Sequence, residues 1–192
     1  MQRVCAGAGV PFVLNDRPDL ASAMGADGVH VGQDDVSAIE ARAVMGEGAV
    51  LGLSTHAPGE LAAAMGQGQS ERQGEGERQG EGERQGEGEG EGEGDMVVPA
   101  PVDYLSAGPV TATPTKPGRP GTGPGYVTHA VRTSPWPVWV TGGVDPESVG
   151  ALVECGARHF VVVRWLVGAD DPEGAARALR RRIDELVADR SA

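Results

Sequence analysis

Cysteine and long apolar runs are both scarce in this chain of 192 residues. The two cysteines, Cys5 and Cys155, stand far apart and form no CxxC pair, so neither a zinc site nor a disulfide framework is indicated. No apolar run approaches the roughly 20 residues that a membrane-spanning helix needs. The start, MQRVCAGAGVPF, lacks the apolar core of a signal peptide. We therefore expect a soluble cytoplasmic protein whose cysteines are small buried residues in a reducing compartment.

Positive charge is also scarce, because 16 Lys and Arg stand against 28 Asp and Glu, for a net charge of −12. Residues 66–95 carry −7 of this charge, since they contain nine Glu, one Asp and three Arg. The acidity is therefore local. The shortage of basic residues argues against a nucleic-acid-binding protein, which needs a basic surface. The chain also has no GxGxxG dinucleotide fingerprint and no Ser-His-Asp arrangement.

Two segments have the composition of loops. Residues 66–95 contain ERQGEG three times in register and can bury no apolar area, so we expect disorder. This insert follows a helix and precedes a strand, and in a βα barrel such a connection lies at the face opposite the active site. A role of the insert as an interaction tail is the alternative. Residues 108–125, rich in Gly, Pro and Thr, predict a mobile loop that covers phosphate. The chain is then one domain, with parts 1–65 and 102–192 separated by the insert 66–101.

Elsewhere, short apolar runs alternate with helix-like stretches. The runs are continuous, as in strands buried on both faces, and occupy residues 10–14, 28–32, 49–54, 102–108, 137–143 and 158–166. The helix-like stretches often open with Asp or Pro-Glu and close with Gly, and occupy residues 17–25, 35–46, 58–66, 126–134, 145–156 and 171–188. This βαβα order predicts an α/β fold with a parallel sheet.

Groups suited to ions or phosphate follow every predicted strand, and in a parallel sheet these ends converge on one crevice. They include Asn15, Asp16 and Arg17; Gln33, Asp34 and Asp35; Ser54, Thr55 and His56; Thr111, Thr113, Thr115 and Lys116; Thr141, Gly142 and Gly143; and Arg164. Two of the carboxylates suit one Mg²⁺ ion, and the glycines let backbone N–H groups approach a phosphate. The residues themselves thus point to an enzyme that handles a diphosphate with Mg²⁺ and a separate phosphomonoester.

These motifs resemble one family over nearly all of the chain outside the insert. VPFVLNDRPDLASAMGADGVHVGQDD, STH, GPVTATPTKP and VTGGVDPESVGALVECGAR, in that order, are similar to thiamine phosphate synthase. The resemblance implies a TIM (βα)₈ barrel, here with about six strands. It implies a transferase of thiamine biosynthesis that joins 4-amino-2-methyl-5-hydroxymethylpyrimidine diphosphate to a thiazole phosphate and releases diphosphate. The implied partners are these small molecules, with no nucleic acid and no membrane; the oligomeric state stays open.

The resemblance also implies roles for single residues. Asp16 and Asp35 match ligands of the Mg²⁺ cofactor. The groups that hold the pyrimidine diphosphate, also the expected catalytic residues, are matched by Asn15, Ser54 and Lys116. The thiazole phosphate contacts are matched by Thr113, Pro114, Thr115 and Gly143. A further pair of phosphate contacts is matched by Val163 and Arg164. A Ser is common in the family where Arg164 stands. His56 is open to a general-base or a structural role, and His30 is expected to be hydrogen-bonded inside the barrel.

The chain departs from the family at its beginning. Residues 1–9 match the tail of the second helix, so the first two strands and a basic strand end are not matched. We expect two open sheet edges and an apolar interior that faces water. Three explanations stand: a longer natural protein, a partner that supplies the strands, or an inactive copy. The competing functions are a binding or scaffold protein and a relative of the thiazole tautomerase.

Overall fold

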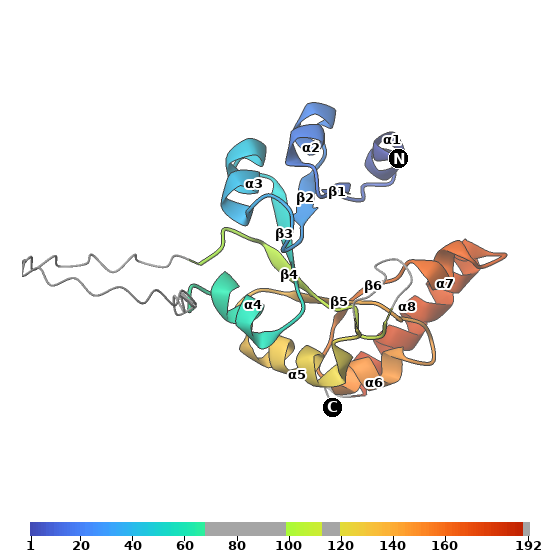
Figure 1. Ribbon diagram of the computed structural model, residues 1–192. Coiled ribbons are helices and arrows are strands. Elements are labelled where there is room, and N and C mark those ends of the chain that lie inside the picture. The colour runs from blue at the N-terminus through green and yellow to red at the C-terminus, as the bar shows by residue number, and fades with distance from the viewer. Residues whose placement is uncertain (68–98, 113–119, 190–192) are drawn as a thin grey trace, which may run out of the picture.

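The computed structural model describes residues 1–67, 99–112 and 120–189, and these residues form a curled half-barrel of six parallel strands. The sheet follows the chain order, β1-β2-β3-β4-β5-β6, and every neighbouring pair is parallel (Figure 1). The strands are β1 (Val13–Asn15), β2 (Gly28–Val31), β3 (Val50–Thr55), β4 (Tyr104–Ala107), β5 (Val138–Thr141) and β6 (His159–Val161). The predicted α/β class, parallel sheet and strand number are confirmed.

Helices follow the strands and lie along the outside of the curve (Figure 1). They are α1 (Gln2–Gly7), α2 (Pro18–Met24), α3 (Ala38–Met45), α4 (Pro58–Ala64), α5 (Gly123–Thr133), α6 (Val149–Glu154), α7 (Arg164–Val167) and α8 (Pro172–Ala188). Asp171 acts as a start signal as predicted, since it accepts a hydrogen bond from the Gly174 N–H on α8. The predicted start at Asp35 was wrong, because α3 begins after Ser37, which forms a capping box with Glu40. Gly25 ends α2 in a left-handed conformation.

Two other predicted boundaries were wrong. The apolar run 158–166 is not one strand, because β6 ends at Val161 and α7 begins at Arg164. The loop predicted over 108–125 is also shorter, since α5 begins at Gly123 with Pro124 in its first turn. Proline fits there because the first turn of a helix has no intrahelical acceptor for its N–H groups.

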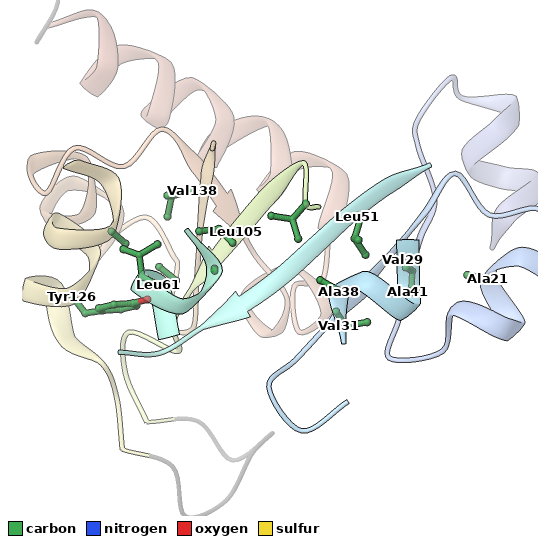
Figure 2. Packing of buried hydrophobic residues seen from close by; sticks show 14 residues of the cluster. Ala21, Val29, Val31, Ala38, Ala41, Leu51, Leu61, Leu105, Tyr126 and Val138 are labelled. Carbon is green, nitrogen blue, oxygen red and sulfur yellow. The ribbon is translucent and has the colours of Figure 1, made fainter. Parts of the chain in front are cut away.

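The core lies between the outer face of the sheet and the helices. Alternate strand residues such as Val29, Leu51, Leu105 and Val140 are fully buried there. Figure 2 shows Val29 and Val31 of β2 beside Ala38 and Ala41 of α3, whose small side chains allow close packing of the helix on the sheet.

The inner face of the sheet differs from the expectation of strands buried on both faces. Trp139 on β5 and Val161 on β6 are each 36% exposed, and His159 is exposed too. Along each strand, residues of this inner face alternate with core residues of the outer face. The inner-face residues include polar side chains, for example His30 and Ser54. The expected apolar interior is therefore only partly apolar, because half of each strand's residues face a cavity rather than helices.

Both edges of the sheet are open within the described part of the chain, as predicted. β1 pairs only with β2, and β6 only with β5. The helix α1 beyond β1 has no buried residue, and Val4 on it is 70% exposed. Its link to the rest of the fold includes the Gln2 side-chain amide, which donates to the Gly25 carbonyl at 2.7 Å. This helix therefore lies beside the sheet without a strand to pack on.

The two sides of the insert meet at the start of β4. The Ala100 N–H donates to the carbonyl of Ala64, the last residue of α4, at 2.8 Å. Arg42 of α3 is buried and holds the segment before β4, because it donates hydrogen bonds to the Pro101 carbonyl and forms a 2.8 Å ion pair with Asp103.

Residues 68–98 lie outside the described residues, so the expected disorder and the domain boundaries stay predictions. No described helix is long and apolar enough to cross a membrane.

Candidate functional site

A cavity of about 620 Å³ opens on the inner face of the sheet. Its walls come from all six strands and from the segments that follow β3, β4, β5 and β6. Five residues predicted from the sequence line it: Asn15, Ser54, Gly143, Val163 and Arg164. The convergence expected for the carboxyl ends of parallel strands is therefore present for these residues. Four other predicted residues, Thr113, Pro114, Thr115 and Lys116, lie outside the described residues.

The carboxylates Asp16 and Asp35 stand just beyond two neighbouring strands, but neither lines the cavity wall. Asp16 has a φ of +64°, a conformation that only glycine adopts without cost, and its N–H donates to the His30 carbonyl at 2.8 Å. The Asn15 amide donates to Asp16 Oδ1 at 2.5 Å. Asp35 Oδ2 accepts a hydrogen bond of 2.7 Å from the Gly32 N–H.

Arg17 has a local partner. Its guanidinium donates two hydrogen bonds to Asp19, from Nε to Oδ1 at 2.8 Å and from the terminal nitrogen to Oδ2 at 2.6 Å. These bonds hold the pKa of Asp19 at about 2. Arg17 does not line the cavity, so it braces the first turn of α2.

Ser54 is held from two sides at the end of β3. The Gln33 amide donates to its carbonyl oxygen at 2.6 Å. Its hydroxyl oxygen lies 2.9 Å from Nε2 of His30, and Nδ1 of the same ring lies 3.0 Å from the Tyr104 hydroxyl oxygen. The position of this hydroxyl in the cavity wall is therefore set by side chains from three strands.

The glycine pair after β5 shapes the far end of the cavity. Gly142 and Gly143 have φ values of +87° and +77°. A Cβ at these positions would collide with Pro109 and Thr111, respectively, so only glycine lets the loops after β4 and β5 pack this closely. The Ser148 hydroxyl donates to the Gly143 carbonyl at 2.7 Å and fixes the loop. The backbone N–H of Ser148 is the main cause that lowers the pKa of Asp145 in this loop.

Arg164, the first residue of α7, supplies positive charge at the cavity. It is exposed, and it makes no ion pair with any residue that the structure describes. An unpaired guanidinium in a cavity wall suits an anionic ligand, because it presents several N–H donors in a fixed plane. Arg164 thus lines the cavity, and its role in the site and its contact with phosphate stay predictions.

His56 also lines the cavity but is engaged by Glu60. Its Nδ1 lies 2.9 Å from Glu60 Oε2, and its backbone N–H donates to the same oxygen at 2.7 Å. Glu60 thus orients the ring at the start of α4. This geometry fits the structural role left open for His56, and it assigns no proton transfer.

Sequence reasoning missed several residues of the cavity wall. These lie at alternate positions of the strands and include His30, Tyr104 and Ser106. The signal was present, because in a strand every second residue shares a face and these polar residues alternate with Val, Leu and Ala. The continuous apolar character of the runs obscured it.

Known proteins similar to this chain share one description. The sequence model of the thiamine monophosphate synthases matches residues 1–71 and 92–166. Thiamine-phosphate synthase from Thermus thermophilus is 43% identical over 178 residues, which cover 91% of this chain and 68% of that protein. The same enzyme from Gloeobacter violaceus is 38% identical over 164 residues, covering 85% of this chain and 38% of that protein. The chain thus spans only part of these relatives.

Solved structures agree on the fold. Thiamine phosphate pyrophosphorylase from Pyrococcus furiosus superimposes with a TM-score of 0.72 at 22% identity, covering 97% of this chain and 73% of that one. A chain of the BexX/CysO complex from Amycolatopsis orientalis gives a TM-score of 0.59 at 18% identity, covering 98% of this chain and 73% of that one. At these identities the likeness concerns the fold alone.

Proposed function

The chain belongs to the thiamine monophosphate synthase family of transferases in thiamine biosynthesis, and on this premise we propose which ligands its cavity takes. The ligands are 4-amino-2-methyl-5-hydroxymethylpyrimidine diphosphate, bound with Mg²⁺, and a thiazole phosphate. The reaction joins the two and releases diphosphate, in the cytoplasm. The partners are small molecules, with no role for nucleic acid or membrane.

One observation carries this proposal: groups of the kinds that bind phosphate surround a single cavity. Asn15 and Ser54 line it at the ends of β1 and β3, while Gly143 and Arg164 line it after β5 and β6. Amide, hydroxyl and guanidinium groups donate hydrogen bonds to phosphoryl oxygens, and a glycine loop opens the backbone to them. Anion-binding groups on both sides of the cavity suit two phosphorylated ligands bound side by side.

The carboxylates Asp16 and Asp35 fit Mg²⁺ by their chemistry. Among the described residues, no three His, Cys, Asp or Glu side chains gather closely enough to hold a metal alone. Mg²⁺ prefers oxygen ligands and is commonly held by one or two carboxylates, water and substrate phosphates. Two acidic residues at adjacent strand ends match that pattern. When bound, the ion would neutralise the negative charge that grows on the leaving diphosphate.

The open sheet supports a second candidate, a binding protein without catalysis. β1 and β6 line the cavity and are also the unpaired edges, so one side of the cavity has no wall among the described residues. A reaction through a cationic intermediate needs water excluded from the site. The binding protein would keep the ligand contacts without that exclusion.

Titration of the full chain with the pyrimidine diphosphate, with and without Mg²⁺, tests the proposal. We expect Mg²⁺-dependent binding that is weakened at least tenfold in Asp35→Asn, because the variant keeps an oxygen for the Gly32 N–H but loses the charge. Asp27→Asn is the matched control, since Asp27 accepts an equally long bond from the Phe12 N–H away from the site. Binding that depends on neither Mg²⁺ nor Asp35 would favour the binding protein. A chain that does not bind the pyrimidine diphosphate would refute both candidate functions.

A further inference from the structure

Three side chains form a hydrogen-bonded chain across the inner face of the sheet. His30 of β2 and Tyr104 of β4 are not on neighbouring strands; each is paired in register with Gly52 of β3, which lies between them. Because Gly52 has no side chain, the two rings meet above it, with centroids 5.4 Å apart and stacked. A Cβ at Gly52 would collide with both rings. The contact between His30 and Tyr104 is therefore built into the sheet by this glycine.

The chain of hydrogen bonds ends at the cavity. Tyr104 Oη lies 3.0 Å from His30 Nδ1, and His30 Nε2 lies 2.9 Å from Ser54 Oγ. Ser54 is two residues beyond Gly52 on the same face of β3 and lines the cavity. Each ring nitrogen of His30 thus has a hydrogen-bond partner in this chain, and the tautomer of the ring decides what Ser54 offers to a ligand.

A neutral imidazole has one N–H donor and one acceptor nitrogen, so only two arrangements are consistent. In the first, Tyr104 donates to Nδ1, Nε2–H donates to Ser54 Oγ, and the Ser54 proton is left to point into the cavity. In the second, Nδ1–H donates to Tyr104, and Ser54 donates to Nε2. The Tyr104 proton would then need another acceptor.

The first arrangement gives the partly buried Tyr104 hydroxyl an acceptor. His30 Nδ1 is the one hydrogen-bond partner of the Tyr104 hydroxyl within the described residues. A partly buried donor without a protein acceptor costs free energy, and the serine proton that points into the cavity is available to water or ligand. Burial also raises the pKa of Tyr104, so the phenol keeps the proton that it donates.

We propose that Tyr104 fixes His30 as the Nε2–H tautomer and thereby makes Ser54 a hydrogen-bond donor toward the cavity. His30 and Tyr104 are then positioning residues that select for an anionic oxygen at Ser54 and against a ligand group that donates there. The identity of that oxygen, a phosphoryl oxygen of the diphosphate, rests on the proposed function. The tautomer itself does not.

The tautomer is measured by ¹⁵N NMR of the full chain, at a pH at which the imidazole is neutral. Protonated and unprotonated ring nitrogens have well-separated shifts, and we expect His30 to show a protonated Nε2. In Tyr104→Phe the ring loses its donor and shifts toward the Nδ1–H form. Tyr126→Phe is the matched control, because the other tyrosine of the chain lies on α5, outside the sheet. A wild-type His30 protonated at Nδ1 overturns the proposal, and this measurement needs no variant.

Binding of inorganic diphosphate with Mg²⁺ gives the second measurement. We expect Tyr104→Phe and Ser54→Ala each to weaken binding about fivefold, the size of one hydrogen bond. The double variant should be no weaker than Ser54→Ala, because both changes remove the same donor. Full affinity in Tyr104→Phe, or additive losses, overturns the donor role. If the tautomer is as expected but wild type binds no diphosphate, the proposed function fails while the His30 assignment stands.

Discussion

At the scale of single residues, the Arg17–Asp19 pair gives a pH-dependent signal. The two hydrogen bonds from Arg17 hold the pKa of Asp19 at about 2, below the value of about 3.9 in an unfolded chain. Because the folded pKa is the lower one, the pair stabilises the fold above about pH 4, and this contribution is lost as the pH falls through about 2. In Arg17→Gln we expect the Asp19 pKa to rise toward its ordinary value.

An NMR titration of the side-chain carboxyl groups measures this shift. Asp145 is the internal control, since the N–H of Ser148 lowers its pKa independently of Arg17. An Asp19 that titrates near its ordinary value in the wild-type chain would contradict the pairing. Both side chains are exposed, so salt will weaken the effect.

Residues at strand ends were predictable, and residues within strands were not. Asn15 and Ser54 follow apolar runs, and the ends of parallel strands always meet on one edge, so their position in the site could be inferred. The environment of His30 depends on Gly52 and on Tyr104, which is 74 residues away. No local pattern encodes such a contact. The sequence predicted correctly which strands Asp16 and Asp35 follow. It did not predict that neither residue lines the cavity wall, because that depends on the conformation of the loops.

At the scale of elements, Gly142 in the β5–α6 connection and Gly150 within α6 differ in what their backbone conformation requires. Gly142 needs its positive φ, and a Cβ there would meet Pro109, whereas Gly150 in α6 has nothing within 4 Å of the Cβ position. We expect Gly142→Ala to lower the free energy of unfolding by about 2 kcal/mol, from backbone strain and collision. Gly150→Ala should raise it by about 0.5 kcal/mol, since alanine favours a helix.

Urea unfolding followed by tryptophan fluorescence compares these two variants with wild type. The same sign of change for both would contradict the assigned backbone conformations. Gly142→Ala should also weaken ligand binding, because it moves a loop of the cavity wall, while Gly150→Ala should leave binding unchanged.

At the scale of the whole molecule, the two unpaired edges of the described sheet border the cavity. Residues of both edge strands line the cavity, Val13 and Asn15 from β1 and Val161 from β6. Among the described residues, no further strand closes the cavity between these two edges. We expect the 192-residue chain, given both substrates and Mg²⁺, to bind both ligands but to form thiamine phosphate more slowly than a full-length relative does.

Product analysis by chromatography tests this, with full-length Thermus thermophilus synthase as the positive control. The same enzyme shortened to the region matched by this chain is the matched control, and it should lose activity in the same way. Turnover by our chain at the rate of the full-length relative would show that six strands suffice. The result would then also remove the main argument for a binding protein.

The junction at Ala64 and Ala100 has a practical consequence. The two flanks of residues 68–98 are joined by a backbone hydrogen bond, and parallel pairing of β3 with β4 holds the parts on either side together. Whatever sequence connects Gln67 to Pro99 need only bridge this short gap. The position is thus suited to circular permutation, to an internal fluorophore or affinity tag, and to cutting the chain into two complementing fragments whose reassembly reports on the sheet.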